Sequence, residues 1–112
     1  TQSSVQTVQH ETEFSRVGIT GLSQDLREQH SGGGLFLERA VEDIREIAPS
    51  LQDKDQTVSY FGFTKKELIR FIDAMQSRGV DRIVPVGQAL DFNGVWDGYR
   101  LLHYFTREIT IL

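Results

Sequence analysis

The sequence contains no cysteine, and this absence excludes several kinds of chemistry from its 112 residues. Such a chain forms no disulfide, binds no metal through a thiolate and has no thiol nucleophile. Its histidines, His10, His30 and His103, are far apart and lack the HxxxH or HxxE spacing of metal sites, and no serine lies in a nucleophile elbow. We therefore expect neither a metal centre nor a complete active site.

Basic charge and long apolar runs are also scarce. The chain has 12 basic and 16 acidic residues, a net charge of -4, and its basic residues are dispersed, so we do not expect nucleic-acid binding. No apolar run approaches the roughly 20 residues of a membrane helix, and the first residues lack the basic and apolar regions of a signal peptide. We expect a cytoplasmic protein with one domain. The first residue is not Met, which fits a fragment, a processed chain or a trimmed protein.

The N-terminal part of the chain has a weak pattern. Residues 1–13 are polar and predict an edge strand or a partly ordered tail. Residues 14–19 predict a short strand. Residues 22–29 predict one or two helical turns, because Ser23 can accept a hydrogen bond at the start of a helix.

A strand, a helix and a second strand are predicted next. Residues 35–37 predict a short buried strand. Residues 41–51 predict a helix, since apolar residues recur there at every third position, and Pro49 is expected to end it. Residues 57–61 are rich in β-branched and aromatic residues and predict the second strand.

The best-defined helix is predicted to begin at Thr64. Thr64 and Glu67 have the spacing of a capping box. Gly79 is expected to be the C′ residue after Arg78, where a helix commonly ends in the left-handed conformation. The predicted apolar stripe consists of Leu68, Phe71, Ile72 and Met75.

The order strand, helix, strand, helix, strand is typical of βαβ crossovers, so the predicted fold class is α/β with a mostly parallel sheet. Residues 1–29 form a weakly patterned N-terminal segment, and residues 30–112 form the α/β part of the single domain. Residues 100–105 predict a helix. Residues 107–112 predict a terminal strand, which would need a partner strand from its own sheet or from another subunit.

The stretch of residues 81–99 joins an apolar run to a polar, glycine-rich turn, and we expect function at this junction. Ile83, Val84 and Val86 predict an inner strand. Pro85 removes one ladder donor and favours an edge or a bulge at this point.

The turn NGVWDGY is one candidate binding loop. Asn93 and Gly98 tolerate positive φ on either side of the only tryptophan, Trp96, which is either a packing anchor or a ligand contact. Asp97 either caps the following helix, the interpretation we favour, or forms an Asx turn. If the loop folded back, Asp91 and Asp97 could also act as an acid and base pair.

The run HSGGG is the second candidate loop. Gly32, Gly33 and Gly34 precede a predicted strand, and their backbone N–H groups could bind an anion or permit a close approach by a neighbouring chain. The run lacks the spacing, the lysine and the helix of a P-loop or a Rossmann turn. A flexible entry to the strand is the alternative.

Residues 30–105 resemble a known enzyme family. The run GVDRIVPVGQALDFNGVWDGYRLL is similar to the C-terminal signature of LuxC-type acyl-CoA reductases, members of the aldehyde dehydrogenase superfamily, most specifically at RIVPVG, ALDF and WDGY. HSGGGLFLE and QTVSYFGF resemble the segments that precede this signature. The resemblance implies that this chain is the C-terminal portion of the catalytic domain, with WDGY near the cofactor and REITIL as the subunit-bridging strand.

The resemblance also implies a reaction and a place for its residues. The parent enzyme would transfer an acyl group from coenzyme A to a cysteine and reduce the thioester to an aldehyde with NADPH or NADH. Without a cysteine, this chain alone is expected to be inactive. The candidate cofactor or substrate residues are Gly32, Gly33, Gly34, Asn93, Trp96, Asp97 and Gly98. The candidate interface residues of the expected homo-oligomer are Tyr104, Phe105, Ile109 and Ile111.

Two other functions stay open. One is a stand-alone α/β binding or oligomerisation module without catalysis. The other is a small independent enzyme that uses Asp91 and Asp97.

Overall fold

The computed structural model describes residues 5–76 and 79–112, and the chain divides into two compact units, Thr1–Asp43 and Ile44–Leu112. Both units combine short strands with short helices, which confirms a mixed α/β class. The strands of the described residues form three separate small sheets of three, two and two strands. These residues therefore do not form the single, mostly parallel sheet that the sequence predicted.

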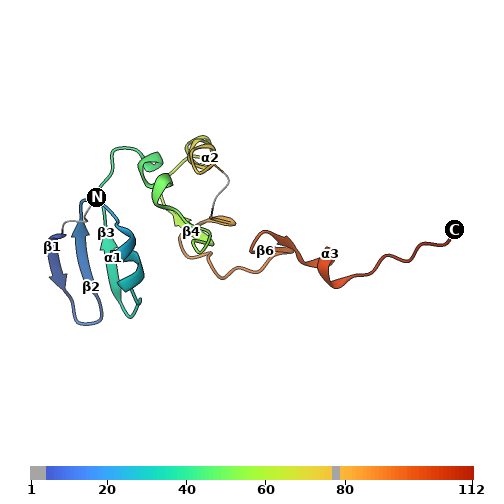
Figure 1. Cartoon of the computed structure of the whole chain (residues 1–112), viewed down its shortest axis with the longest axis horizontal. Coiled ribbons are helices and arrows are strands. Elements are labelled where there is room, and N and C mark those ends of the chain that lie inside the picture. Colours follow the sequence, from blue (N-terminus) through green and yellow to red (C-terminus); the bar gives the residue numbers. More distant parts are fainter. Residues whose placement is uncertain (1–4, 77–78) are drawn as a thin grey trace. The chain divides into compact units, whose positions relative to one another are not determined.

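The first unit contains a three-stranded mixed sheet. Its strands β1 (Val5–His10), β2 (Ser15–Ile19) and β3 (Leu35–Glu38) lie side by side in that order (Figure 1). β1 is antiparallel to β2, and β2 is parallel to β3. The helix α1 (Gln24–Gln29) connects the two parallel strands, and Ser23 accepts a hydrogen bond from a backbone N–H at its N-terminus, as predicted.

Side chains on β3 alternate between half-buried and exposed positions, whereas β2 becomes buried toward its end. Ile19 is buried, whereas Phe36 is exposed and meets Phe14 edge-on with ring centroids 5.9 Å apart. The prediction of a buried strand at residues 35–37 is therefore wrong, because only one face of β3 is covered. Arg16 and Glu38 form a two-pronged ion pair on exposed positions of neighbouring strands, with N–O distances of 2.6 and 2.9 Å.

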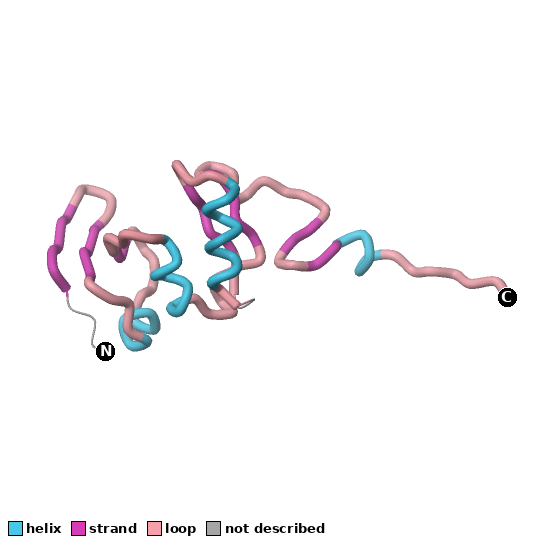
Figure 2. Tube along the Cα trace, turned by 90° about the horizontal axis from the view of Figure 1, so that it is seen from above, coloured by secondary structure: helices cyan, strands magenta, loops and turns pink. Residues whose placement is uncertain are grey.

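The second unit contains a βαβ crossover. Strands β4 (Thr57–Tyr60) and β5 (Arg82–Pro85) are parallel, with Thr57 opposite Arg82, and helix α2 (Lys65–Ala74) connects them. Among the described residues β5 pairs with β4 alone, so it is an edge strand, which agrees with Pro85. The inner strand predicted from Ile83, Val84 and Val86 is therefore wrong: β5 ends at Pro85, and Val86 beyond it is 63% exposed. Figure 2 shows α2 beside the two strands.

A 3₁₀ helix, η1 (Ile44–Ser50), takes the place of the α-helix predicted for residues 41–51. Apolar residues at every third position fit the three-residue turn of a 3₁₀ helix as well as one face of an α-helix, which explains the wrong prediction. Pro49 lies inside η1 and does not end it. Ile44 and Ile47 pack against the core of the unit.

The capping box of α2 is confirmed, and α2 supplies most of the core. Thr64 N–H donates to Glu67 Oε2 over 2.7 Å, and Glu67 N–H donates to Thr64 Oγ1 over 3.3 Å. Phe71 and Met75 are buried together with Ala48. Ile72, predicted in the apolar stripe, is 46% exposed, because the segments that pack against α2 cover only part of that stripe.

The end of α2 also differs from its prediction. The helix ends at Ala74, and Gln76 has a φ of 53°, so the left-handed residue comes earlier than Gly79. Gly79 is left-handed too, with a φ of 66°, and a Cβ there would collide with the carbonyl oxygen of Gln52. The role of Gly79 is thus to allow two backbone segments to approach each other closely. Arg78 lies outside the described residues.

A β-hairpin and a short helix follow. Strands β6 (Val95–Trp96) and β7 (Tyr99–Arg100) are antiparallel, and helix α3 (Leu101–Phe105) confirms the helix predicted for this stretch. Residues 106–112 are neither helix nor strand, so the predicted terminal strand is absent from this chain by itself (Figure 2). A strand needs a neighbour to pair its backbone groups, and the described part of the chain offers none to this segment.

Candidate functional site

Arg82 is the buried polar residue at the start of β5, with an exposed fraction of 9%. Its Nη1 donates to the carbonyl oxygen of Ala89 over 2.9 Å, and its Nη2 donates to that of Asp91 over 2.8 Å. A guanidinium group can do this because its donors lie in one rigid plane. Both hydrogen bonds close the loop after β5 onto the strand from which it leaves.

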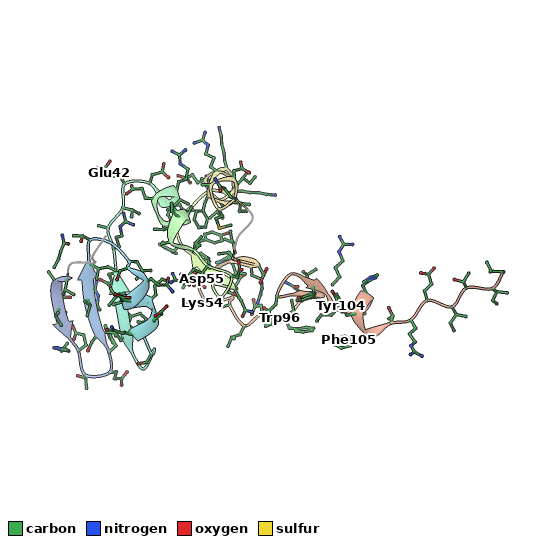
Figure 3. All side chains as sticks on the ribbon, viewed as in Figure 1. Glu42, Lys54, Asp55, Trp96, Tyr104 and Phe105 are labelled. Carbon is green, nitrogen blue, oxygen red and sulfur yellow. The ribbon has the colours of Figure 1, made fainter. Side chains whose placement is uncertain are left out.

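The same guanidinium lies over the only tryptophan. Its Cζ atom is 4.6 Å from the centroid of the Trp96 ring, within the range of a cation–π interaction. The ring of Phe92 stacks with that of Trp96, with centroids 5.6 Å apart and planes inclined by 27°. Figure 3 shows Trp96 on the hairpin of the second unit. We call Arg82, Ala89, Asp91, Phe92 and Trp96 the Arg82 cluster.

The Arg82 cluster joins three sequence motifs. Arg82 belongs to RIVPVG, Ala89 and Asp91 belong to ALDF, and Trp96 belongs to WDGY. Sequence reasoning selected these motifs but did not select Arg82. The available signal was a charged residue at the start of an apolar strand, because such a residue must find polar partners when it is buried.

Asp97 is a turn residue, and the favoured interpretation of it as a helix cap is wrong. Asp97 and Gly98 form the two-residue loop between β6 and β7, with φ of 47° and 78°, as in the hairpin turns that favour Asp-Gly. The N-cap of α3 is Arg100, and it makes no side-chain capping hydrogen bond. A Cβ on Gly98 would lie 3.2 Å from Oδ1 of Asp81, a second residue that sequence reasoning missed.

Asn93 forms an Asx turn. For Asp97, this kind of turn was the alternative to a helix cap. Its Oδ1 accepts from the backbone N–H of Val95 over 2.8 Å. The backbone N–H of Leu101 donates to the carbonyl oxygen of Gly94 over 3.0 Å. The turn NGVWDGY is therefore closed by hydrogen bonds on both sides of the hairpin.

The three glycines of HSGGG lie in the other unit. Gly32, Gly33 and Gly34 all have positive φ, between 64° and 79°. A Cβ on Gly34 would lie 2.9 Å from the carbonyl oxygen of Glu13, whereas Gly32 and Gly33 face open space. This loop thus has a close backbone approach at Gly34 and room for a Cβ at Gly32 and Gly33.

The described residues do not fit a complete dinucleotide site. The HSGGG loop leads into β3 rather than into a helix, so it lacks the aligned N–H groups and the dipole that bind a pyrophosphate. Its His30 Nε2 is 2.8 Å from the carbonyl oxygen of Leu35 and is used within the loop. The two candidate loops belong to different units.

The predicted interface residues are exposed. Tyr104 meets Tyr99 edge-on with centroids 5.0 Å apart, and Figure 3 shows Tyr104 and Phe105 on α3. Ile109 and Ile111 are 87% and 93% exposed. These side chains are available to a partner, and their role in an interface stays a prediction.

Within 5–76 and 79–112, no group of three or more His, Cys, Asp or Glu side chains could hold a metal ion. In the same residues, every helix is too short or too polar to cross a membrane.

Together the fold and the Arg82 cluster define a mixed α/β protein in which one buried arginine joins a strand, a loop and a hairpin. The family model described as acyl-CoA reductase (LuxC) matches residues 35–108, which run from β3 past α3 and include all three motifs. The chain belongs to the LuxC acyl-CoA reductase family, and the resemblance to this family seen in the sequence is confirmed. A search of curated proteins and a search of solved structures found no match.

Proposed function

We propose that this chain is the C-terminal part of an acyl-CoA reductase that reduces an acyl-CoA thioester to an aldehyde with NADPH or NADH. The observation that carries the proposal is the family match over residues 35–108. The Arg82 cluster supports it, because the three motifs most specific to the family are in contact through one buried side chain. Under this proposal residues 30–112 belong to the catalytic domain and residues 1–29 form an N-terminal segment.

The reaction requires groups that this chain lacks. A thiolate must attack the acyl carbon, hydrogen-bond donors must stabilise the tetrahedral oxyanion, and a hydride donor must lie beside the thioester. The chain has no cysteine, and its described residues do not fit a complete dinucleotide site. The nucleophile and most of the cofactor site are therefore proposed to lie outside it, as in the aldehyde dehydrogenase superfamily that the sequence resembles.

Two loops, each within its own unit, are proposed as contacts of the reductase's ligands. A Cβ on Gly32 or Gly33 would meet no atom within 4 Å, and the hairpin turn places Asp97 next to the half-buried Trp96. Asn93 and Gly98 shape the turn that carries both residues. For each loop taken by itself, we propose a contact with the cofactor or with the acyl thioester.

Activity measurements on two proteins test this function. The protein that contains this chain together with the rest of the reductase is expected to oxidise NADPH or NADH when acyl-CoA is added, and to release an aldehyde. Purified residues 1–112 are expected to do neither and to show no acyl adduct by mass spectrometry, since they contain no thiol. An acyl adduct on the isolated chain, or an inactive full-length protein, would contradict the proposal.

Assembly is a second part of the proposal: the enzyme is a cytoplasmic homo-oligomer joined through residues 107–112. The exposure of Ile109 and Ile111 supports it, because an apolar segment without a neighbouring strand can pair with another chain. Replacing both isoleucines by lysine should lower the mass in sedimentation, whereas Thr110→Lys, on the opposite side of such a strand, should have a much smaller effect. An unchanged mass in the double variant would exclude this joint.

The alternative is a binding or oligomerisation module without catalysis. The lack of a thiol favours it for the chain by itself. The two functions differ in one observable, because a module would leave acyl-CoA and NADPH unchanged in every protein that contains the chain.

A further inference from the structure

We infer that Arg82 is a positioning residue for the proposed reaction: it holds the loop of residues 87–94 and the Trp96 hairpin in the arrangement that the substrate meets. The inference rests on the proposed function, since it assigns a task within that reductase. Arg82 itself is 9% exposed and acts through the residues that it holds.

The contacts of Arg82 are local to one face of the sheet. Neighbouring side chains of a strand point to opposite faces, and Ile83 packs against the core of Ala48, Phe71 and Met75. Arg82 instead reaches the two loop carbonyls and the Trp96 ring. Its loss should therefore displace the loop and the hairpin while the core stays packed.

The contacts of the Arg82 guanidinium group indicate that this group has a fixed position. Among the described residues, the partners of the Arg82 guanidinium are two carbonyl oxygens and an aromatic ring. These three partners fix the group, because two of its N–H donors are directed at carbonyl oxygens and its central carbon is held over the Trp96 ring. A lysine keeps the charge but presents a compact ammonium group without that plane, so it cannot reproduce all three contacts.

Trp96 makes the inference directly measurable. It is the only tryptophan, so its emission reports on the Arg82 cluster alone. Three variants are compared: Arg82→Met, Arg82→Lys and the control Arg70→Met, which alters an exposed arginine of α2. Fluorescence and acrylamide quenching are measured on residues 1–112. Turnover is measured on the full-length reductase at a temperature at which circular dichroism shows every variant to be folded.

Both Arg82 variants are expected to shift the Trp96 emission to the red, to increase its quenching and to lower kcat/KM. Misplaced groups in an active site typically cost about tenfold to a hundredfold in rate, and we expect a loss in that range. Arg70→Met should leave all three quantities unchanged. If Arg82→Met fails to fold, Arg82→Lys provides the same measurements.

Two results would overturn the inference. Unchanged emission and quenching in the Arg82 variants would show that Arg82 does not hold Trp96. Shifted emission with unchanged turnover would show that the arrangement has no part in the reaction. An inactive wild-type reductase would instead overturn the proposed function, and the fluorescence comparison would still decide whether Arg82 holds the hairpin.

Discussion

Replacing Phe71 by alanine is expected to lower the free energy of unfolding of the second unit by about 3–5 kcal/mol, the usual range for a buried phenylalanine. Phe71 is 2% exposed and forms a buried cluster with Ala48 and Met75, against which Ile44, Ile47, Leu51 and Ile83 pack. Transfer of the side chain from water accounts for about 1.5–3 kcal/mol. The remainder comes from the cavity, because the short 3₁₀ helix η1 can only partly close it.

The same helix offers a matched control. Ile72→Ala removes an apolar side chain one position away that is 46% exposed. About half of a full transfer term is then at stake, roughly 1 kcal/mol. Alanine also favours the helix slightly over isoleucine, which reduces the loss further.

Urea unfolding of residues 1–112 measures both effects, with Trp96 fluorescence and far-ultraviolet circular dichroism as probes. Since whole domains are stable by only about 5–15 kcal/mol, Phe71→Ala should leave the second unit close to unfolded. Equal losses for Phe71→Ala and Ile72→Ala, or a loss below about 1 kcal/mol for Phe71→Ala, would refute the assignment of this core.

Three further predictions concern local features. Thr64→Ala should lower the thermal stability of α2 by about 1 kcal/mol, because it removes the confirmed capping box, and Thr64→Ser should restore most of it. Asp97→Ala should destabilise the hairpin by roughly 1 kcal/mol, since alanine tolerates the positive φ poorly, whereas Asp97→Gly should not destabilise it. If Asp97 also faces substrate, both variants should lower the turnover of the full-length reductase. Hydrogen bonds from Arg16 lower the pKa of Glu38 below its ordinary value of 4.5, so the ion pair adds stability above that pH and loses it as the pH falls through the lowered pKa. In acid titrations followed by circular dichroism, the wild type should be slightly more stable than Glu38→Gln near neutral pH, and the two stabilities should converge in acid. Equal curves at every pH would contradict this prediction.

Several elements followed from the sequence because their causes are local. The capping box at Thr64, the serine cap of α1 and the strands β2, β4 and β5 depend on residues within a few positions of one another. The family was also recognisable, since its motifs are contiguous runs within residues 35–108. Periodicity alone could not separate a 3₁₀ helix from an α-helix at Ile44–Ser50, because both bring every third residue to a similar face.

The sequence by itself determined where helices and strands can begin and which family the chain belongs to. Tertiary structure decided which side chains meet. Arg82 bonds to carbonyl oxygens seven and nine positions away and to a ring beyond them, and these contacts exist only because the loop folds back over β5. In the same way Ile72 is exposed because of what packs on α2, and residues 106–112 form no strand because a strand requires a neighbour, which residues 5–76 and 79–112 do not supply.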